Sequence, residues 1–83
     1  MKVEIRYFAS IREAVGVAAE SVETKADTLA ALRDELIALD APHARALARG
    51  RALRMALNQV MCKESVTLQE GAEVAFFPPV TGG

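Results

Sequence analysis

The spacing of the leucines between positions 29 and 39 is the feature that most restricts how this chain can fold. They recur at intervals of three and four residues, as Leu29, Leu32, Leu36 and Leu39. This spacing predicts a helix with one apolar stripe, running from about Leu29 to Asp40 and capped by Asp27 or Thr28. Arg33 falls outside the stripe. The stripe itself needs a large apolar surface to cover it.

Alternating patterns predict the strands that can supply this surface. In residues 2–8, Val3, Ile5 and Tyr7 share one face, and the charged residues and Phe8 share the other. Shorter or weaker strand patterns follow in residues 18–24, 53–57, 60–63 and 73–77. Each of these strands has one apolar face, so together they can form a half-buried sheet.

Two short helical pieces are predicted between the strands. Ser10 can cap one that runs from Ile11 to Val15, and Pro42 begins another that ends near Arg49. A mixed sheet is then the only large apolar partner for the long helix. The sequence therefore predicts a single α+β domain of the β-grasp type, in which one main helix packs on a mixed sheet of four to five strands.

Composition and charge exclude several classes of function. The net charge of −1 gives no general attraction to nucleic acid or to an anionic membrane. Cys62 is the single cysteine, and no Cys/His cluster offers a metal site. The sequence shows no signal-peptide pattern and no apolar run long enough to span a bilayer. We expect no bound metal, no nucleic-acid or membrane partner, and a reducing, cytoplasmic setting.

The last eight residues, from Phe76 to Gly83, form a composite signal. Prolines cannot donate ladder hydrogen bonds, so Pro78 and Pro79 end the last strand and stiffen the base of the tail. The final two glycines carry no Cβ, so an extended end can pass between close walls and present its carboxylate. A protease scar would explain two glycines but not the whole composite. We expect a folded body over residues 1–77 and a flexible tail over residues 78–83, with Gly83 as the reactive residue.

Three large apolar side chains are predicted on the outer, otherwise polar face of the sheet. Strand alternation points Phe8, Met61 and Phe77 away from the helix. Scattered exposed apolar residues are normal, but these three lie on strands that should be neighbours. We therefore expect them to form one binding patch near the tail.

The other candidate residues favour packing or surface roles. Cys62 points inward from a short strand and has no base nearby in the sequence, which favours packing. The single histidine, His43, is expected at the surface. A dense group of arginines fits either a solvated face or an acidic protein partner: Arg45, Arg49, Arg51 and Arg54. No nucleophile–base arrangement stands out, so the chain is expected to be non-catalytic on its own.

The tail and several internal stretches share an order and spacing with one known family. The stretches are Phe8-Ala9, Arg12-Glu13, Gly16, Thr28 with Ala31-Leu32-Arg33, Ala56-Leu57-Asn58-Gln59, and Gly71 with Glu73 to Gly83. Nearly end to end, the chain resembles the small subunits of molybdopterin synthase, ubiquitin-like sulfur carriers in molybdenum cofactor biosynthesis. It departs from that pattern in the arginine-rich segment 42–54 and at Ala72, where an acidic residue is common.

This resemblance implies a mechanism and a set of partners. An activating enzyme would use ATP to adenylate Gly83, and a sulfur donor protein would convert the adenylate to a thiocarboxylate. The tail, made up of Pro78, Pro79, Val80, Thr81, Gly82 and Gly83, would then enter the large subunit of the synthase and give its sulfur to a cyclic pterin phosphate precursor. The resemblance implies a heterotetramer of two small and two large subunits. It implies a partner interface that includes Phe8, Arg12, Met61 and Phe77, and no cofactor bound by this chain.

Three other functions share parts of this pattern. A sulfur carrier for thiamine synthesis or tRNA thiolation would have the same fold and glycine end. A ubiquitin-like protein modifier would use the same adenylate but form an isopeptide bond. A plain interaction module would have an inert tail.

Overall fold

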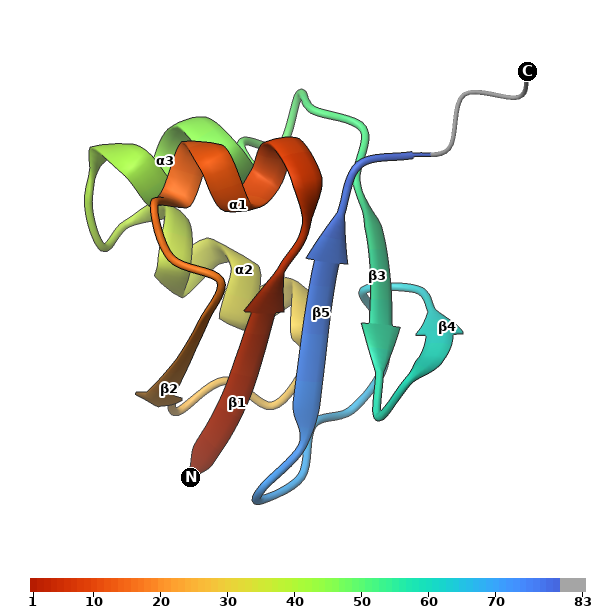
Figure 1. Cartoon of the computed structure of the whole chain (residues 1–83). Helices are drawn as coiled ribbons and strands as arrows, with labels where there is room; N and C mark the ends of the chain where they lie inside the picture. Colours follow the sequence, from red (N-terminus) through yellow and green to blue (C-terminus); the bar gives the residue numbers. More distant parts are fainter. Residues whose placement is uncertain (80–83) are drawn as a thin grey trace.

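The computed structural model describes residues 1–79 and contains five strands and three helices within them. In chain order the elements are β1 (Lys2–Tyr7), α1 (Ala9–Val15), β2 (Ala19–Glu23), α2 (Leu29–Ile37), α3 (Ala41–Leu47), β3 (Arg54–Leu57), β4 (Val60–Cys62) and β5 (Glu73–Phe77). The predicted order of strands and helices is therefore observed (Figure 1).

The strands form one mixed sheet in the order β2-β1-β5-β3-β4. The first and last strands, β1 and β5, are parallel neighbours in its centre, and every other pairing is antiparallel. Helix α2 packs behind the sheet, while α1 and α3 lie at the end where β1 and β5 finish (Figure 1). The predicted β-grasp fold is confirmed.

The core lies between the sheet and the helices. Val3, Ile5 and Tyr7 of β1 are buried beside Val74 and Phe76 of β5, because strand alternation sends these side chains to one face. The rings of Tyr7 and Phe76 stack with their centroids 6.1 Å apart. This face is the one that the leucines of α2 cover.

Helix α2 is shorter than the leucine spacing predicts. Thr28 caps it by accepting a hydrogen bond from the backbone N–H of Ala31, and Leu29, Leu32 and Leu36 are buried. Leu39 is 58% exposed, contrary to the prediction. The helix ends at Ile37, and Asp40 instead caps α3 through the N–H of His43, so Leu39 lies in the turn between two helices.

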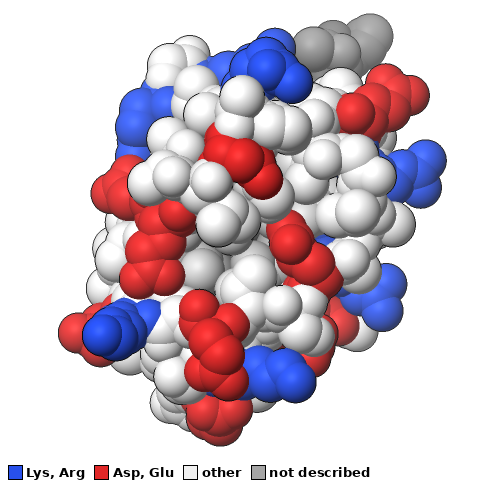
Figure 2. All heavy atoms as spheres, turned by 90° about the vertical axis from the view of Figure 1, so that its left-hand side faces the viewer, with Lys and Arg blue, Asp and Glu red and all other residues white. Residues whose placement is uncertain are grey.

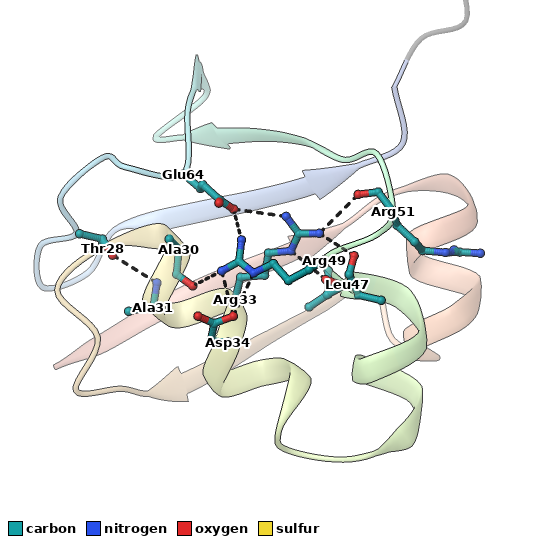
Figure 3. A network of polar contacts seen from close by, with 10 residues as sticks. Thr28, Ala30, Ala31, Arg33, Asp34, Leu47, Arg49, Arg51 and Glu64 are labelled. Atoms are coloured by element: carbon teal, nitrogen blue, oxygen red, sulfur yellow. Dashed lines mark hydrogen bonds and ion pairs between the residues drawn. The ribbon is translucent and has the colours of Figure 1, made fainter.

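The prediction that Arg33 lies outside the buried stripe is wrong, because the residue is only 5% exposed. Its Nε and Nη2 each donate a hydrogen bond of 2.8 Å, to the backbone carbonyls of Leu47 and Ala48. These carbonyls stand at the end of α3, where no helical N–H follows to bond them. Arg33 thus fastens the loop after α3 to α2, and Glu64 balances its charge at 3.2 Å (Figure 3).

Helix α1 begins earlier than predicted. Phe8, and not Ser10, occupies the N-cap position, with no side-chain capping bond, and the helix starts at Ala9. Gly16 closes it with a φ of 98°, and its N–H donates to the carbonyl of Arg12. The early start places Phe8 directly between the end of β1 and the helix.

Candidate functional site

The tail leaves the body from the centre of the sheet. Phe77 is the last residue of β5, which is bonded to β1 on one side and β3 on the other. Pro78 and Pro79 follow it, and prolines cannot extend the ladder. The root of the tail is therefore held by a strand that is paired on both sides, at the end of β5 that lies near α1 (Figure 1). The predictions for Val80, Thr81, Gly82 and Gly83 lie outside the described residues.

Phe8, Met61 and Phe77 lie together on the outer face beside the tail root, and we call them the outer patch. The rings of Phe8 and Phe77 meet edge to face with centroids 6.2 Å apart. Phe8 is 45% and Met61 50% exposed, and Phe77 is half-buried. All three line one shallow hollow of about 510 Å³ together with Arg6, Ala56, Gln59, Glu73 and Ala75.

Strand pairing explains why the hollow forms. Ala56 of β3 lies opposite both Met61 of β4 and Ala75 of β5. Two small side chains thus form the floor between larger ones, and this leaves room for a partner's side chains. Arg6 and Glu73 make an ion pair of 3.4 Å at the rim. The sequence alone could not place this pair, because β1 and β5 come from opposite ends of the chain.

The outer patch does not include Arg12. That residue lies on α1 and is exposed, and it does not line the hollow. Among the clustered arginines, Arg54 is paired in register with Phe77 across β3 and β5. Arg54 therefore lies beside the tail root.

One of the clustered arginines, Arg49, forms ion pairs within the folded domain. Arg49 forms ion pairs with Asp34 at 2.9 Å and Glu64 at 2.5 Å, and it donates to the carbonyl of Ala30. Its pKa is raised by the hydrogen bonds to these two carboxylates. Arg33 shares Glu64 with it (Figure 3), so Arg49 joins α2 to the loops on either side of β3 and β4.

His43 is buried, so the prediction of a surface histidine is wrong. Its Nδ1 lies 2.6 Å from Asp40 and its Nε2 2.7 Å from Glu20, and Tyr7 donates its hydroxyl to the same Glu20. Burial alone would lower the pKa of His43, but the hydrogen bonds to Glu20 and Asp40 outweigh it and raise that pKa. The histidine thus joins α3 to β1 and β2. Sequence spacing does not predict that His43 is buried in this network, because Asp40, Glu20 and Tyr7 come from three different parts of the chain.

Cys62 is half-buried on β4, and burial raises the pKa of its thiol, which disfavours the reactive thiolate. This agrees with the packing role that the sequence favours. Within residues 1–79 no group of three or more His, Cys, Asp or Glu side chains could hold a metal ion. In the same residues no helix is long and apolar enough to cross a membrane.

Together these features define a class of protein. A mixed sheet grasping one main helix, with its C-terminal segment leaving the central strand beside an apolar patch, is the arrangement of a ubiquitin-like β-grasp protein.

Comparisons with known proteins identify the family within this class. The model of the ThiS family matches residues 5–83. The molybdopterin synthase sulfur carrier subunit of Escherichia coli is 42% identical over 98% of this chain and 99% of its own length. This chain belongs to the ThiS family and, within it, to the family of molybdopterin synthase sulfur carrier subunits.

Solved structures agree with this assignment. SAMP1 from Haloferax volcanii superposes with a TM-score of 0.78 at 26% identity, over 100% of both chains. A complex of subunits 1 and 2 of the molybdopterin-converting factor from Helicobacter pylori contains a chain with a TM-score of 0.67 at 27% identity, again over 100% of both chains. The resemblance seen in the sequence is therefore confirmed across the whole chain.

Proposed function

We propose that this chain is the sulfur carrier subunit of a molybdopterin synthase and acts in molybdenum cofactor biosynthesis. The observation that carries this proposal is its likeness, along nearly its whole length, to a protein named for that function. The described site supports it, since the tail is rooted in the central strand and leaves beside the outer patch. In this chain, residues 1–77 serve as the folded body and residues 78–83 as the carrier arm.

The chemistry resides at Gly83. Its carboxylate oxygen attacks the α-phosphorus of ATP in the activating enzyme, giving an acyl-adenylate and pyrophosphate. A sulfide equivalent from a donor protein then attacks the carbonyl carbon and expels AMP, which leaves a thiocarboxylate. A carboxylate is a poor electrophile, and adenylation gives it a good leaving group. The thiocarboxylate sulfur is the nucleophile that this subunit brings to the pterin precursor, held at high effective concentration.

The outer patch serves as the docking surface for the large subunit and for the activating enzyme. Large, half-exposed apolar side chains around an alanine floor are the kind of anchor that dominates protein interfaces. The related Helicobacter pylori protein is found in a complex of subunits 1 and 2. A shared docking surface means that the two partners bind in turn. In this proposal the synthase assembles as two small and two large subunits.

Deletion of Gly83 tests the role of the tail. The deletion shortens an extended tail by about 3.3–3.6 Å, and even about 1 Å of misplacement can cost a hundredfold in rate. We expect neither thiolation by the activating enzyme, ATP and a sulfur source, nor molybdopterin formation. Gly82→Leu should fail as well, because its side chain obstructs a narrow channel, whereas Gly83→Ala keeps the chain length and is the milder control. A deletion that is thiolated and active at the normal rate would overturn the assignment.

A second function is favoured by one observation. SAMP1, whose structure is similar, is named a small archaeal modifier protein. As a modifier, this chain would use the same adenylate but pass Gly83 to a lysine amine. Higher-mass conjugates on denaturing gels, lost on deletion of Gly83, would distinguish this function from sulfur transfer.

A further inference from the structure

The edge of the sheet formed by β2 carries an apolar groove that the proposed function does not use. It runs between β2 and α2, has a volume of about 320 Å³, and is lined by Val22, Glu23, Leu32, Glu35, Leu36 and Leu39. We call it the edge groove. Leu39, the leucine that helix α2 leaves outside the core, contributes an exposed wall. The groove therefore offers apolar surface on a different side of the body from the outer patch.

The backbone of β2 is available along this groove. Within residues 1–79, β2 pairs only with β1. Backbone hydrogen bonds join Thr24 to Met1 and Tyr7 to Ala18, so by antiparallel alternation the N–H and C=O groups of Val22 and Glu20 also face β1. The groups of Ala19, Ser21 and Glu23 then point away from the sheet. Such a row of unpaired donors and acceptors is a template for an added strand.

The charge around the groove indicates which kind of partner segment would fit it. Glu23 and Glu35 form its rim. The side chain of Glu23 is 78% exposed and lies 3.7 Å from the N-terminal ammonium, and Glu35 accepts a hydrogen bond from the hydroxyl of Thr24. Acidic side chains are spread over this side of the molecule, and basic side chains lie mostly toward its margins, with one beside the lower acidic group (Figure 2). A second copy of this chain would bring the same acidic rim against it. An extended segment that alternates apolar and basic residues would instead match both the groove and its rim.

We propose that the edge groove binds an extended, basic segment of a partner protein, which adds to the sheet beside β2. Alternate side chains of an added strand point to the two faces of the sheet. Those on the inner face enter the groove between Val22 and Leu39, and the basic side chains on the outer face reach Glu23. Because the outer patch and the tail root lie at the end of β1, on β4 and at the end of β5, this segment binds while they are occupied. The proposal stands independently of the sulfur-carrier function.

A synthetic peptide tests this directly. The probe is a capped peptide of about eight alternating lysines and valines, within the usual length of a strand. Backbone amide shifts of the full chain are recorded during titration, with affinity measured by fluorescence anisotropy. Shifts should be confined to β2, α2 and the α2–α3 turn, and affinity should fall as salt is added. Methylating alternate peptide nitrogens should abolish binding, because the added strand loses its donors.

Matched variants locate the site on the chain. Glu23→Lys and Leu39→Ser should each weaken binding roughly five- to tenfold, from lost charge and lost apolar contact. Val60→Ser removes another exposed apolar side chain, at the far edge of the sheet, and should change nothing. The proposal is overturned if the peptide does not bind, or if one with glutamates in place of lysines binds equally well. It is also overturned if the same amides shift with protein concentration alone, since the occupant is then a second copy.

Discussion

At the scale of single residues, His43 shows how one side chain joins three elements. Two carboxylates, Asp40 and Glu20, face its ring nitrogens, and Tyr7 meets the ring edge to face at 6.1 Å. The backbone and side-chain hydrogen bonds from His43 lower the pKa of Asp40, while the pKa of His43 itself is raised. The charged form of His43 is therefore more favourable in the folded state than in the unfolded chain.

This network predicts how stability depends on pH. A raised pKa in the folded state adds stability that is fully present below the ordinary value of 6.5 and is lost as pH rises through the raised pKa. The lowered pKa of Asp40 adds stability that is lost as pH falls below its ordinary value of 3.8. Urea unfolding at a series of pH values should show stability falling from mildly acidic to mildly alkaline pH, and His43→Gln should flatten that fall. An NMR titration of His43 with a pKa at or below 6.5 would contradict this interpretation.

A substitution at Phe77 tests whether the outer patch is the partner interface. Phe77→Asp puts a charge into the outer patch where the ring meets Phe8. We expect partner affinity to fall by about thirtyfold or more, the effect of losing an interface anchor, while the domain stays folded. Val60→Asp, on β4 outside the outer patch, is the matched control. Calorimetry against the large subunit makes the comparison, and unchanged affinity in Phe77→Asp would show that the patch is not the interface.

At the scale of elements, the alternating and leucine patterns predicted all five strands and α2, because burial on one face imposes a period on the sequence. The two short helices were predicted from Ser10 and Pro42 instead. They could not give the end of α2, since Leu39 fits the helical period but lies in a turn fixed by the cap at Asp40. They also missed Arg33, because its partners are backbone carbonyls that any sequence would supply. A periodic pattern predicts which face of an element is buried. Caps and polar contacts depend instead on which elements pack together in the fold.

Two leucines of the same stripe test this interpretation of α2. Leu36 is 3% exposed, so Leu36→Ala should lower the free energy of unfolding by roughly 2–5 kcal/mol. Leu39 is 58% exposed, so Leu39→Ala should change it by less than about 0.5 kcal/mol. Urea denaturation of the two variants beside the parent chain gives both values. Equal losses would mean that the helix continues and that Leu39 is buried in solution.

At the scale of the whole molecule, the fold separates surfaces for different purposes. The inner face of the sheet holds the core, the outer face carries the outer patch, and β5 delivers the tail from the centre. The alternating pattern predicted that Phe8, Met61 and Phe77 would share a face, and strand pairing brings them to one hollow. It could not predict the edge groove, which depends on how α2 crosses the sheet beside β2.

The intact mass of the chain purified from its own host tests most directly whether this molecule carries sulfur on Gly83. We expect a fraction whose mass exceeds that of the unmodified chain by the difference between one sulfur and one oxygen atom. Fragmentation should place that difference on Gly83, and a host that lacks the activating enzyme should not produce it. A chain found only with its free carboxylate, or only joined to other proteins through Gly83, would show that it is not a sulfur carrier.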